Sequence, residues 1–195
     1  PDPNPVHQRF FDPPRGVLPP DLDVIGTRYI EALYSELRGW LKAQERDEPI
    51  GVEFSGGIDS ASVLLCLYRL LLNEGQSPSR LKAFTLTIDG EGADARQARE
   101  FLTRVNLEML GEVIDVPSSA LDPLRAVAVI EDYKPLDVEC AAVNLALLEG
   151  IRERYPDWHL IVDGDGGDEN LKDYPIEVNS ELTIRSVVNN RMLYQ

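Results

Sequence analysis

Short apolar segments alternate with segments of helical periodicity through most of the chain, and this alternation limits the fold more than any other feature. Strands are expected at residues 50–54, 82–88, 112–116 and 159–162. Helical periodicity covers residues 25–41, 61–72, 93–110, 123–132, 138–154 and 181–193. Strands separated by connections this long pair in parallel through right-handed crossovers. The pattern predicts an α/β fold, a Rossmann-like doubly wound parallel sheet with helices on both faces.

The first 22 residues differ from the rest of the chain because they hold seven of its 14 prolines. Proline removes a backbone donor and blocks helix formation. We therefore predict a proline-rich arm or linker at 1–22 and one domain at 23–195. The arm is expected to pack through its apolar side chains, which are Phe10, Phe11, Val17 and Leu18. Asp23 is the expected N-cap of the first helix.

Charge and cysteine content exclude several classes of function. The formal net charge of −15 repels phosphate backbones, so we expect no nucleic-acid partner. We also expect no membrane partner, since no apolar run approaches the roughly 20 residues that cross a bilayer. The two cysteines, Cys66 and Cys140, lie in apolar helical patterns and predict buried thiols rather than a disulfide scaffold or zinc site. A cytoplasmic location is the expectation from these features.

A glycine-rich segment joins the first predicted strand to the apolar helix after it. Its sequence is SGGIDS, and it consists of Ser55, Gly56, Gly57, Ile58, Asp59 and Ser60. The glycines allow a sharp turn and close approach of a ligand. Helix-start amides, the helix dipole and the two serine hydroxyls together predict an anion site. An ordinary glycine-rich turn is the alternative, and the lysine of a Walker-type loop is absent.

SGGIDS resembles the PP-loop of the ATP pyrophosphatase superfamily, which holds the pyrophosphate of ATP. A second segment at 160–169, LIVDGDGGDE, resembles the S-G-E-G-x-D-E segment of the asparagine synthetase C-terminal (synthetase) domain family. Between them, residues 84–88 resemble a strand of that family, and residues 129–133 resemble its I-E-x-Y/F segment. The resemblance covers roughly 23–174, and the family includes β-lactam synthetase-like and lasso-peptide cyclase-like members.

The resemblance implies an adenine nucleotide alpha-hydrolase-like version of the predicted fold, with ATP and Mg²⁺ bound. It also implies an ATP-dependent amide-forming ligase that adenylates a carboxylate, releases pyrophosphate and then admits an amine. The expected partners are a small-molecule or peptide carboxylate and an amine donor, with a glutaminase domain or subunit as one source of ammonia. Residues 23–195 are expected to lack part of the helical C-terminal region of the family.

The resemblance assigns roles to single residues. Mg²⁺ is assigned to Asp59 and Asp168, whose hard carboxylate oxygens suit that ion. Catalytic roles are assigned to Asp165, which stands where the family has a longer glutamate, and to Glu131 near the acyl substrate. Contacts to ATP and pyrophosphate are assigned to Ser55, Gly56, Gly57, Ile58, Asp59, Ser60, Val52, Leu86 and Gly164. Of these, Val52 and Leu86 are expected to contact adenine through their backbone.

Other interpretations of these residues stay open. Asp59 is also a candidate helix cap, and Asp168 a candidate turn carboxylate. Val52 and Leu86 are as well explained by a place in the core, and Glu131 by a place at a helix border. DGDGGDE also resembles a calcium loop, although it lacks the spacing of one. Two further functions remain as hypotheses: a non-catalytic nucleotide-binding or partner-docking module, and a tRNA-modifying PP-loop enzyme, against which the acidic charge argues.

Overall fold

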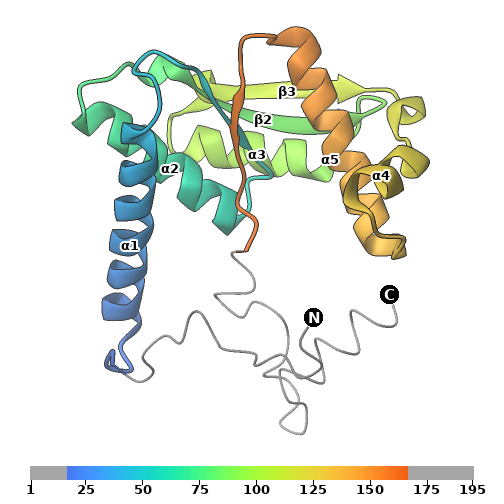
Figure 1. The fold of residues 1–195 in the computed structure, drawn as a ribbon. Coiled ribbons are helices and arrows are strands. Elements are labelled where there is room, and N and C mark those ends of the chain that lie inside the picture. Colours follow the sequence, from blue (N-terminus) through green and yellow to red (C-terminus); the bar gives the residue numbers. More distant parts are fainter. Residues whose placement is uncertain (1–16, 167–195) are drawn as a thin grey trace, which may run out of the picture.

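The computed structural model describes residues 17–166, and residues 1–16 and 167–195 lie outside its described part. Within it, four parallel strands form one sheet in the order β3-β2-β1-β4 (Figure 1). The strands are β1 (Ile50–Glu53), β2 (Leu81–Ile88), β3 (Gly111–Val116) and β4 (Leu160–Val162). All three neighbouring pairs are parallel, which confirms the predicted sheet.

Five α-helices connect or flank these strands in the described part of the chain. They are α1 (Leu22–Lys42), α2 (Ile58–Asn73), α3 (Ala93–Arg104), α4 (Pro123–Ile130) and α5 (Pro135–Arg154). Short 3₁₀ turns lie at Pro78–Arg80, Glu108–Leu110 and Ser118–Ala120. The predicted helix at 181–193 lies outside the described residues.

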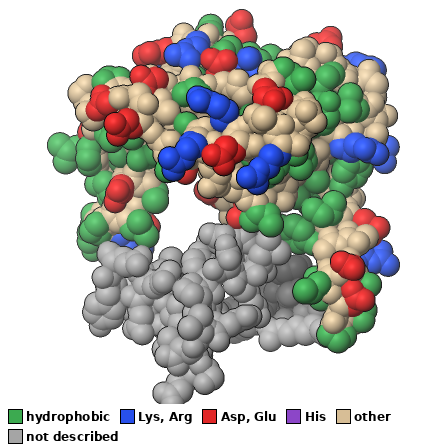
Figure 2. Space-filling view, turned by 180° about the vertical axis from the view of Figure 1, so that it is seen from behind, with side chains coloured by type: hydrophobic (Ala, Val, Ile, Leu, Met, Phe, Trp, Pro, Cys, Tyr) green, Lys and Arg blue, Asp and Glu red, His purple; other side chains and the backbone are tan. Residues whose placement is uncertain are grey.

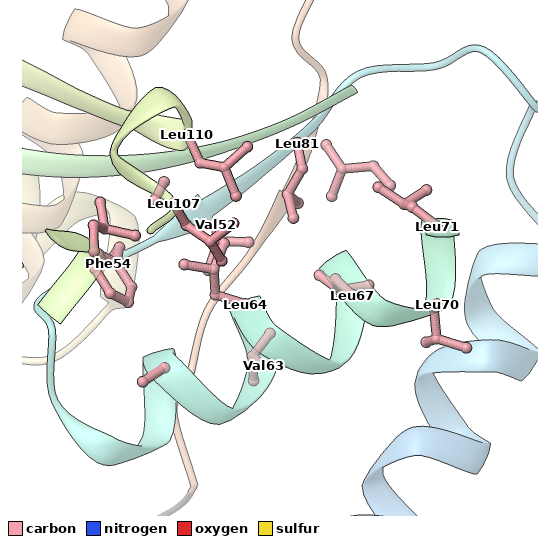
Figure 3. Close-up of a cluster of buried hydrophobic side chains, with 14 of the residues drawn as sticks. Val52, Phe54, Val63, Leu64, Leu67, Leu70, Leu71, Leu81, Leu107 and Leu110 are labelled. Atoms are coloured by element: carbon pink, nitrogen blue, oxygen red, sulfur yellow. The ribbon is translucent and has the colours of Figure 1, made fainter. Parts of the chain in front are cut away.

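Helices cover both faces of the sheet, as predicted (Figure 1). On one face, α2 and α3 bury leucines such as Leu64 and Leu102 against Val52 of β1, together with side chains from α1 (Figure 3). On the other face, α5 packs Ile151 and its apolar neighbours against β2 and β3. A Cβ atom on Gly150 would lie 2.4 Å from a methyl carbon of Ile114, so only glycine lets α5 approach β3 this closely.

The strand order contains a reversal between β1 and β4. The chain adds β2 and then β3 on one side of β1, and it returns through α4 and α5 to add β4 on the other side. Right-handed crossovers therefore place α2 and α3 on one face and α5 on the opposite face. The loops that follow β1 and β4 therefore lie at the point where the strand order reverses, which is where doubly wound sheets bind their ligands.

Two predicted helix boundaries are wrong. The N-cap of α1 is Asp21 rather than Asp23, because the Asp21 carboxylate accepts hydrogen bonds from the amides of Asp23 and Val24. The helix predicted over 93–110 ends at Arg104, because Asn106 adopts a left-handed backbone with φ of 55°. The remaining segment forms the 3₁₀ turn instead.

Two predictions about burial are also wrong. Cys66 is buried on α2 as expected, but Cys140 is exposed on α5 and lines a cleft. Val17 and Leu18 were expected to pack but are exposed, while Phe10 and Phe11 lie outside the described residues. None of the helices in the described part combines the length and the apolar character that a membrane crossing requires.

Candidate functional site

A cleft of about 720 Å³ opens at the carboxyl ends of β1, β2 and β4, between the sheet edge and α5. Six of the residues predicted from the sequence line it, namely Ser55, Asp59, Ser60, Leu86, Gly164 and Asp165. Residues that were not predicted also line it, among them Glu53, Phe84, Asp94, Asp137, Cys140, Val143, Asn144 and Leu147. The cleft lies at the strand reversal, so the fold itself places a ligand site here.

The first glycine-rich loop is held tightly against its neighbours. Gly56 has a φ of 78°, and a Cβ atom there would lie 2.6 Å from the backbone nitrogen of Ala98 on α3. The Ser55 Oγ accepts a hydrogen bond of 3.2 Å from the Gly57 amide and lies 3.3 Å from the Ser60 Oγ. Since Gly57 is the N-cap of α2, no cap side chain covers the first-turn amides. This arrangement suits a bound anion.

The β1–β2 pairing continues beyond the end of β1 and fixes where this loop starts. The Phe54 amide donates to the Phe84 carbonyl at 2.8 Å, and the Thr85 hydroxyl donates to the Phe54 carbonyl at 2.6 Å. Both bonds hold the residue that precedes Ser55. The loop therefore leaves the sheet from a fixed position.

The second glycine-rich loop lies directly on the first turn of α2. A Cβ atom on Gly164 would lie 2.7 Å from the Ser60 backbone nitrogen and 3.0 Å from the Asp59 carbonyl carbon. The Asp163 carboxylate turns this loop by accepting a hydrogen bond of 3.1 Å from the Asp165 amide. The two loops thus meet at Gly164, while Asp168 lies outside the described residues.

Glu53 and Asn144 form a polar pair inside the cleft. The Asn144 Nδ2 donates a 2.9 Å hydrogen bond to the Glu53 Oε2. Burial, followed by the nearby charges of Asp163 and Asp165, raises the pKa of Glu53 from 4.5 to about 7, although the bond from Asn144 opposes the rise. Sequence reasoning missed this residue, but a carboxyl at the end of the apolar strand GVEF was the available signal.

Five of the predicted site residues in the described part of the chain do not line the cleft, namely Gly56 and Gly57 of the first loop, Val52, Glu131 and Ile58. Val52 is fully buried in the core between the sheet and α2. Glu131 is exposed and ends α4 in a left-handed conformation with φ of 54°. Ile58 begins α2 with a side chain that is 69% exposed. These placements leave the roles assigned to the five residues as predictions.

The described lining of the cleft is strongly acidic. It contains six carboxyl groups, on Glu53, Asp59, Asp94, Asp137, Asp163 and Asp165, and no Lys or Arg. This bias is local, since Lys and Arg side chains lie among Asp and Glu on the face of the molecule in Figure 2. A polyphosphate would need a cation to bind beside so many carboxylates.

A magnesium ion fits this lining better than a cage made only of protein ligands. The described residues contain no group of three or more metal-binding side chains. Mg²⁺ commonly binds through one or two carboxylates together with substrate phosphates and water. Asp59, at the start of α2 beside the anion site, is suitably placed to be such a carboxylate.

Comparison with known proteins gives a family match and similarity to solved structures. A family model described as asparagine synthase matches residues 36–190, which include both glycine-rich loops. The NH3-dependent NAD synthetase from Campylobacter jejuni subsp. jejuni NCTC 11168, in complex with the nitrate ion, is 17% identical with a TM-score of 0.47. That similarity covers 87% of this chain and 73% of the synthetase chain. No curated protein matches the sequence.

Proposed function

Since the chain belongs to the asparagine synthase family, whose members are ATP-utilising amide-forming ligases, we propose that its cleft binds ATP and activates a carboxylate. The observation that carries this proposal is the contact between the two glycine-rich loops at Gly164 and Ser60. Two loops that are distant in sequence meet at the amino end of α2, beside a cleft large enough for a nucleotide.

The triphosphate would lie against the first loop. No side chain caps the start of α2 at Gly57, and the Ser55 and Ser60 hydroxyls lie beside it, so these groups are the proposed donors to phosphate oxygens. Bound Mg²⁺, which Asp59 and Asp168 would hold, supplies charge stabilisation for the leaving pyrophosphate. In this proposal, the two loops would hold the phosphates at the start of α2, where a substrate carboxylate can approach through the cleft.

The proposed reaction has two steps. A substrate carboxylate oxygen bonds to the α-phosphorus, the bond between the α- and β-phosphates breaks, and pyrophosphate leaves. An amine then attacks the acyl carbon of the acyl-adenylate, AMP leaves with the electrons of the acyl–oxygen bond, and the amine loses a proton. We propose Asp165 as the residue beside this second step, since it lies in the loop that packs on α2. Glu131 remains a proposed contact to the acyl substrate, at the exposed end of α4.

Carboxylate-dependent exchange of labelled pyrophosphate into ATP tests the first step. The assay would use the chain with Mg·ATP and mixtures of amino-acid and peptide carboxylates. Asp59→Ala should lower exchange by about 10²-fold or more, because it removes the proposed metal ligand at the phosphate site. Asp47→Asn, which changes a carboxylate before β1 that does not line the cleft, is the matched control.

Each result separates the candidate functions. Exchange that survives Asp59→Ala would refute the proposed metal role. Binding of Mg·ATP without pyrophosphate release in any substrate mixture would instead favour the non-catalytic nucleotide-binding module. Failure of the unmodified chain to bind Mg·ATP would refute both functions.

A further inference from the structure

The Glu53 carboxyl occupies a distinct position in the cleft. Glu53 is the last residue of β1, two positions before Ser55, where the first glycine-rich loop begins. Its carboxyl reaches toward α5, where Asn144 holds Oε2. On the side of β2 and α5, the cleft is lined by the partly exposed apolar side chains of Leu86 and Val143, with Phe84 and Leu147 buried at its edge, while Asp163 and Asp165 approach from the loop after β4.

The cleft therefore has two ends with different chemistry. The end at the start of α2 carries backbone amides and hydroxyl groups that suit phosphate. At the end between β2 and α5, the partly exposed apolar side chains of Leu86 and Val143 line the cleft and suit a planar heterocycle rather than a hydrated ion. A nucleotide bound by its phosphates at the first end would direct its base toward Glu53 at the second.

We propose that Glu53 reads the edge of the nucleobase and, with Asn144 as its positioning residue, makes the cleft selective for adenine. This inference rests on the proposed function, because it requires the phosphates to lie at the first loop. A neutral carboxyl has one acceptor and one donor side by side. Adenine offers the complementary pair, an exocyclic amino group that donates and an adjacent ring nitrogen that accepts.

Asn144 determines which oxygen of the Glu53 carboxyl accepts a hydrogen bond and which oxygen carries the proton. A carboxyl that could rotate freely would also match hypoxanthine, whose carbonyl oxygen and ring N–H reverse the adenine pattern. The Asn144 amide donates to Oε2 and so keeps this oxygen as the acceptor, which leaves Oε1 to carry the proton. Glu53 and Asn144 together therefore discriminate between adenine and hypoxanthine, whereas Glu53 without Asn144 would bind both bases.

The surroundings of Glu53 favour the neutral form that this recognition needs. Burial and the charges of Asp163 and Asp165 already raise the pKa of Glu53 to about 7. The other titratable groups that line the cleft are Asp59 on α2, Asp94 on α3, and Asp137 and Cys140 on α5, together with the two aspartates after β4. None of the described lining residues is a cation, and a bound triphosphate adds further negative charge, so nucleotide binding should favour uptake of a proton.

Calorimetric titration of the full chain with Mg·ATP and Mg·ITP tests the selectivity. The unmodified chain should prefer ATP, and Glu53→Leu should reduce the ratio of ATP to ITP affinity by about tenfold because two hydrogen bonds are lost. Glu53→Gln should keep the preference, since its amide has the same acceptor and donor as the neutral acid. Asn144→Leu should reduce the ratio while Glu53 is intact.

Proton uptake gives a second, independent readout. In two buffers of different ionisation enthalpy at pH 8, the unmodified chain should take up close to one proton for each ATP bound. Glu53→Gln should take up none, and Glu100→Gln, an exposed change on α3, should behave like the unmodified chain. This measurement decides the question even where Glu53→Leu fails to fold.

The results that would overturn this inference differ from those that would overturn the proposed function. If the unmodified chain binds neither nucleotide, the proposed function itself fails. If it binds Mg·ATP but Glu53→Leu keeps the full ATP preference, or Glu53→Gln keeps the proton uptake, Glu53 does not read the base. A loss confined to the apparent affinity for the amine substrate would also overturn the inference, since it would place Glu53 beside the amine.

Discussion

Replacing Glu53 by Gln should stabilise the free protein at neutral and alkaline pH and leave its stability nearly unchanged at pH 4. The cause is the cost of holding a charged carboxylate between the sheet and α5. In the folded protein, burial and two neighbouring aspartates raise the pKa of Glu53 to about 7, against 4.5 for an ordinary glutamate. A glutamine side chain keeps the shape and the bond to Asn144 without the charge.

The sign and size of the effect follow from linkage between protonation and folding. Because the folded pKa is raised, the neutral form of Glu53 contributes stability in full below pH 4.5, and that stability is lost as the pH rises through about 7. The difference between 4.5 and about 7 corresponds to at most about 3 kcal/mol at about 1.36 kcal/mol per pH unit. Partial solvent exposure of the side chain reduces this to roughly 1–2 kcal/mol.

Urea denaturation at pH 4, 5, 6, 7 and 8 measures the effect directly. The free energy of unfolding of Glu53→Gln minus that of the unmodified chain should rise between pH 5 and 8 and then level off. Glu100→Gln provides the matched control, because its carboxylate is exposed and its difference should stay flat. A difference for Glu53→Gln that is also flat over this range would refute the electrostatic reasoning. It would mean that water or a nearby cation already compensates the charge.

Two further substitutions test contacts that the structure shows. Gly164→Ala should lower pyrophosphate exchange by about tenfold or more, because the added Cβ would lie 2.7 Å from the Ser60 nitrogen and displace the second loop from α2. Exchange at the normal rate would show that this contact does not set the site geometry. Asp21→Ala should reduce the free energy of unfolding, measured in urea, by about 1 kcal/mol because the α1 cap is lost. Asp23→Ala should reduce the free energy of unfolding by less. An equal or larger reduction for Asp23→Ala would indicate that Asp23 is the cap.

Much of the fold was predictable because its elements carry strong local signals. β1 and β4 are short apolar runs that end in glycine-rich loops, and α2 is almost wholly apolar, so their type and order were clear from the sequence. The helix start at Asp21 was harder, because two aspartates in the same short stretch can each cap a helix. The side chain that does so depends on backbone angles, which are extended at Asp21 and helical after it.

The convergence of the two loops was also predictable, since the carboxyl ends of parallel strands meet at one edge of a sheet. What could not be predicted was the face on which each side chain lies. Val52 and Glu53 are neighbours in β1, yet one points into the core beneath α2 and the other toward α5. A shift of one residue exchanges these faces, so the sequence alone does not show that the Glu53 side chain, rather than that of Val52, turns toward α5 and the cleft.

The acidic lining links the metal, the phosphates and Glu53 in one electrostatic argument. Six carboxyl groups around a triphosphate would repel it at any reasonable distance unless their charge were reduced. A divalent ion at Asp59 reduces the repulsion at the phosphate end, but its effect weakens toward the apolar end of the cleft. There the remaining way to lower the charge is to protonate a carboxyl, and Glu53 is the lining carboxyl whose pKa already lies near neutrality. The surroundings that make Glu53 costly to ionise therefore also give it the hydrogen-bonding pattern that matches adenine.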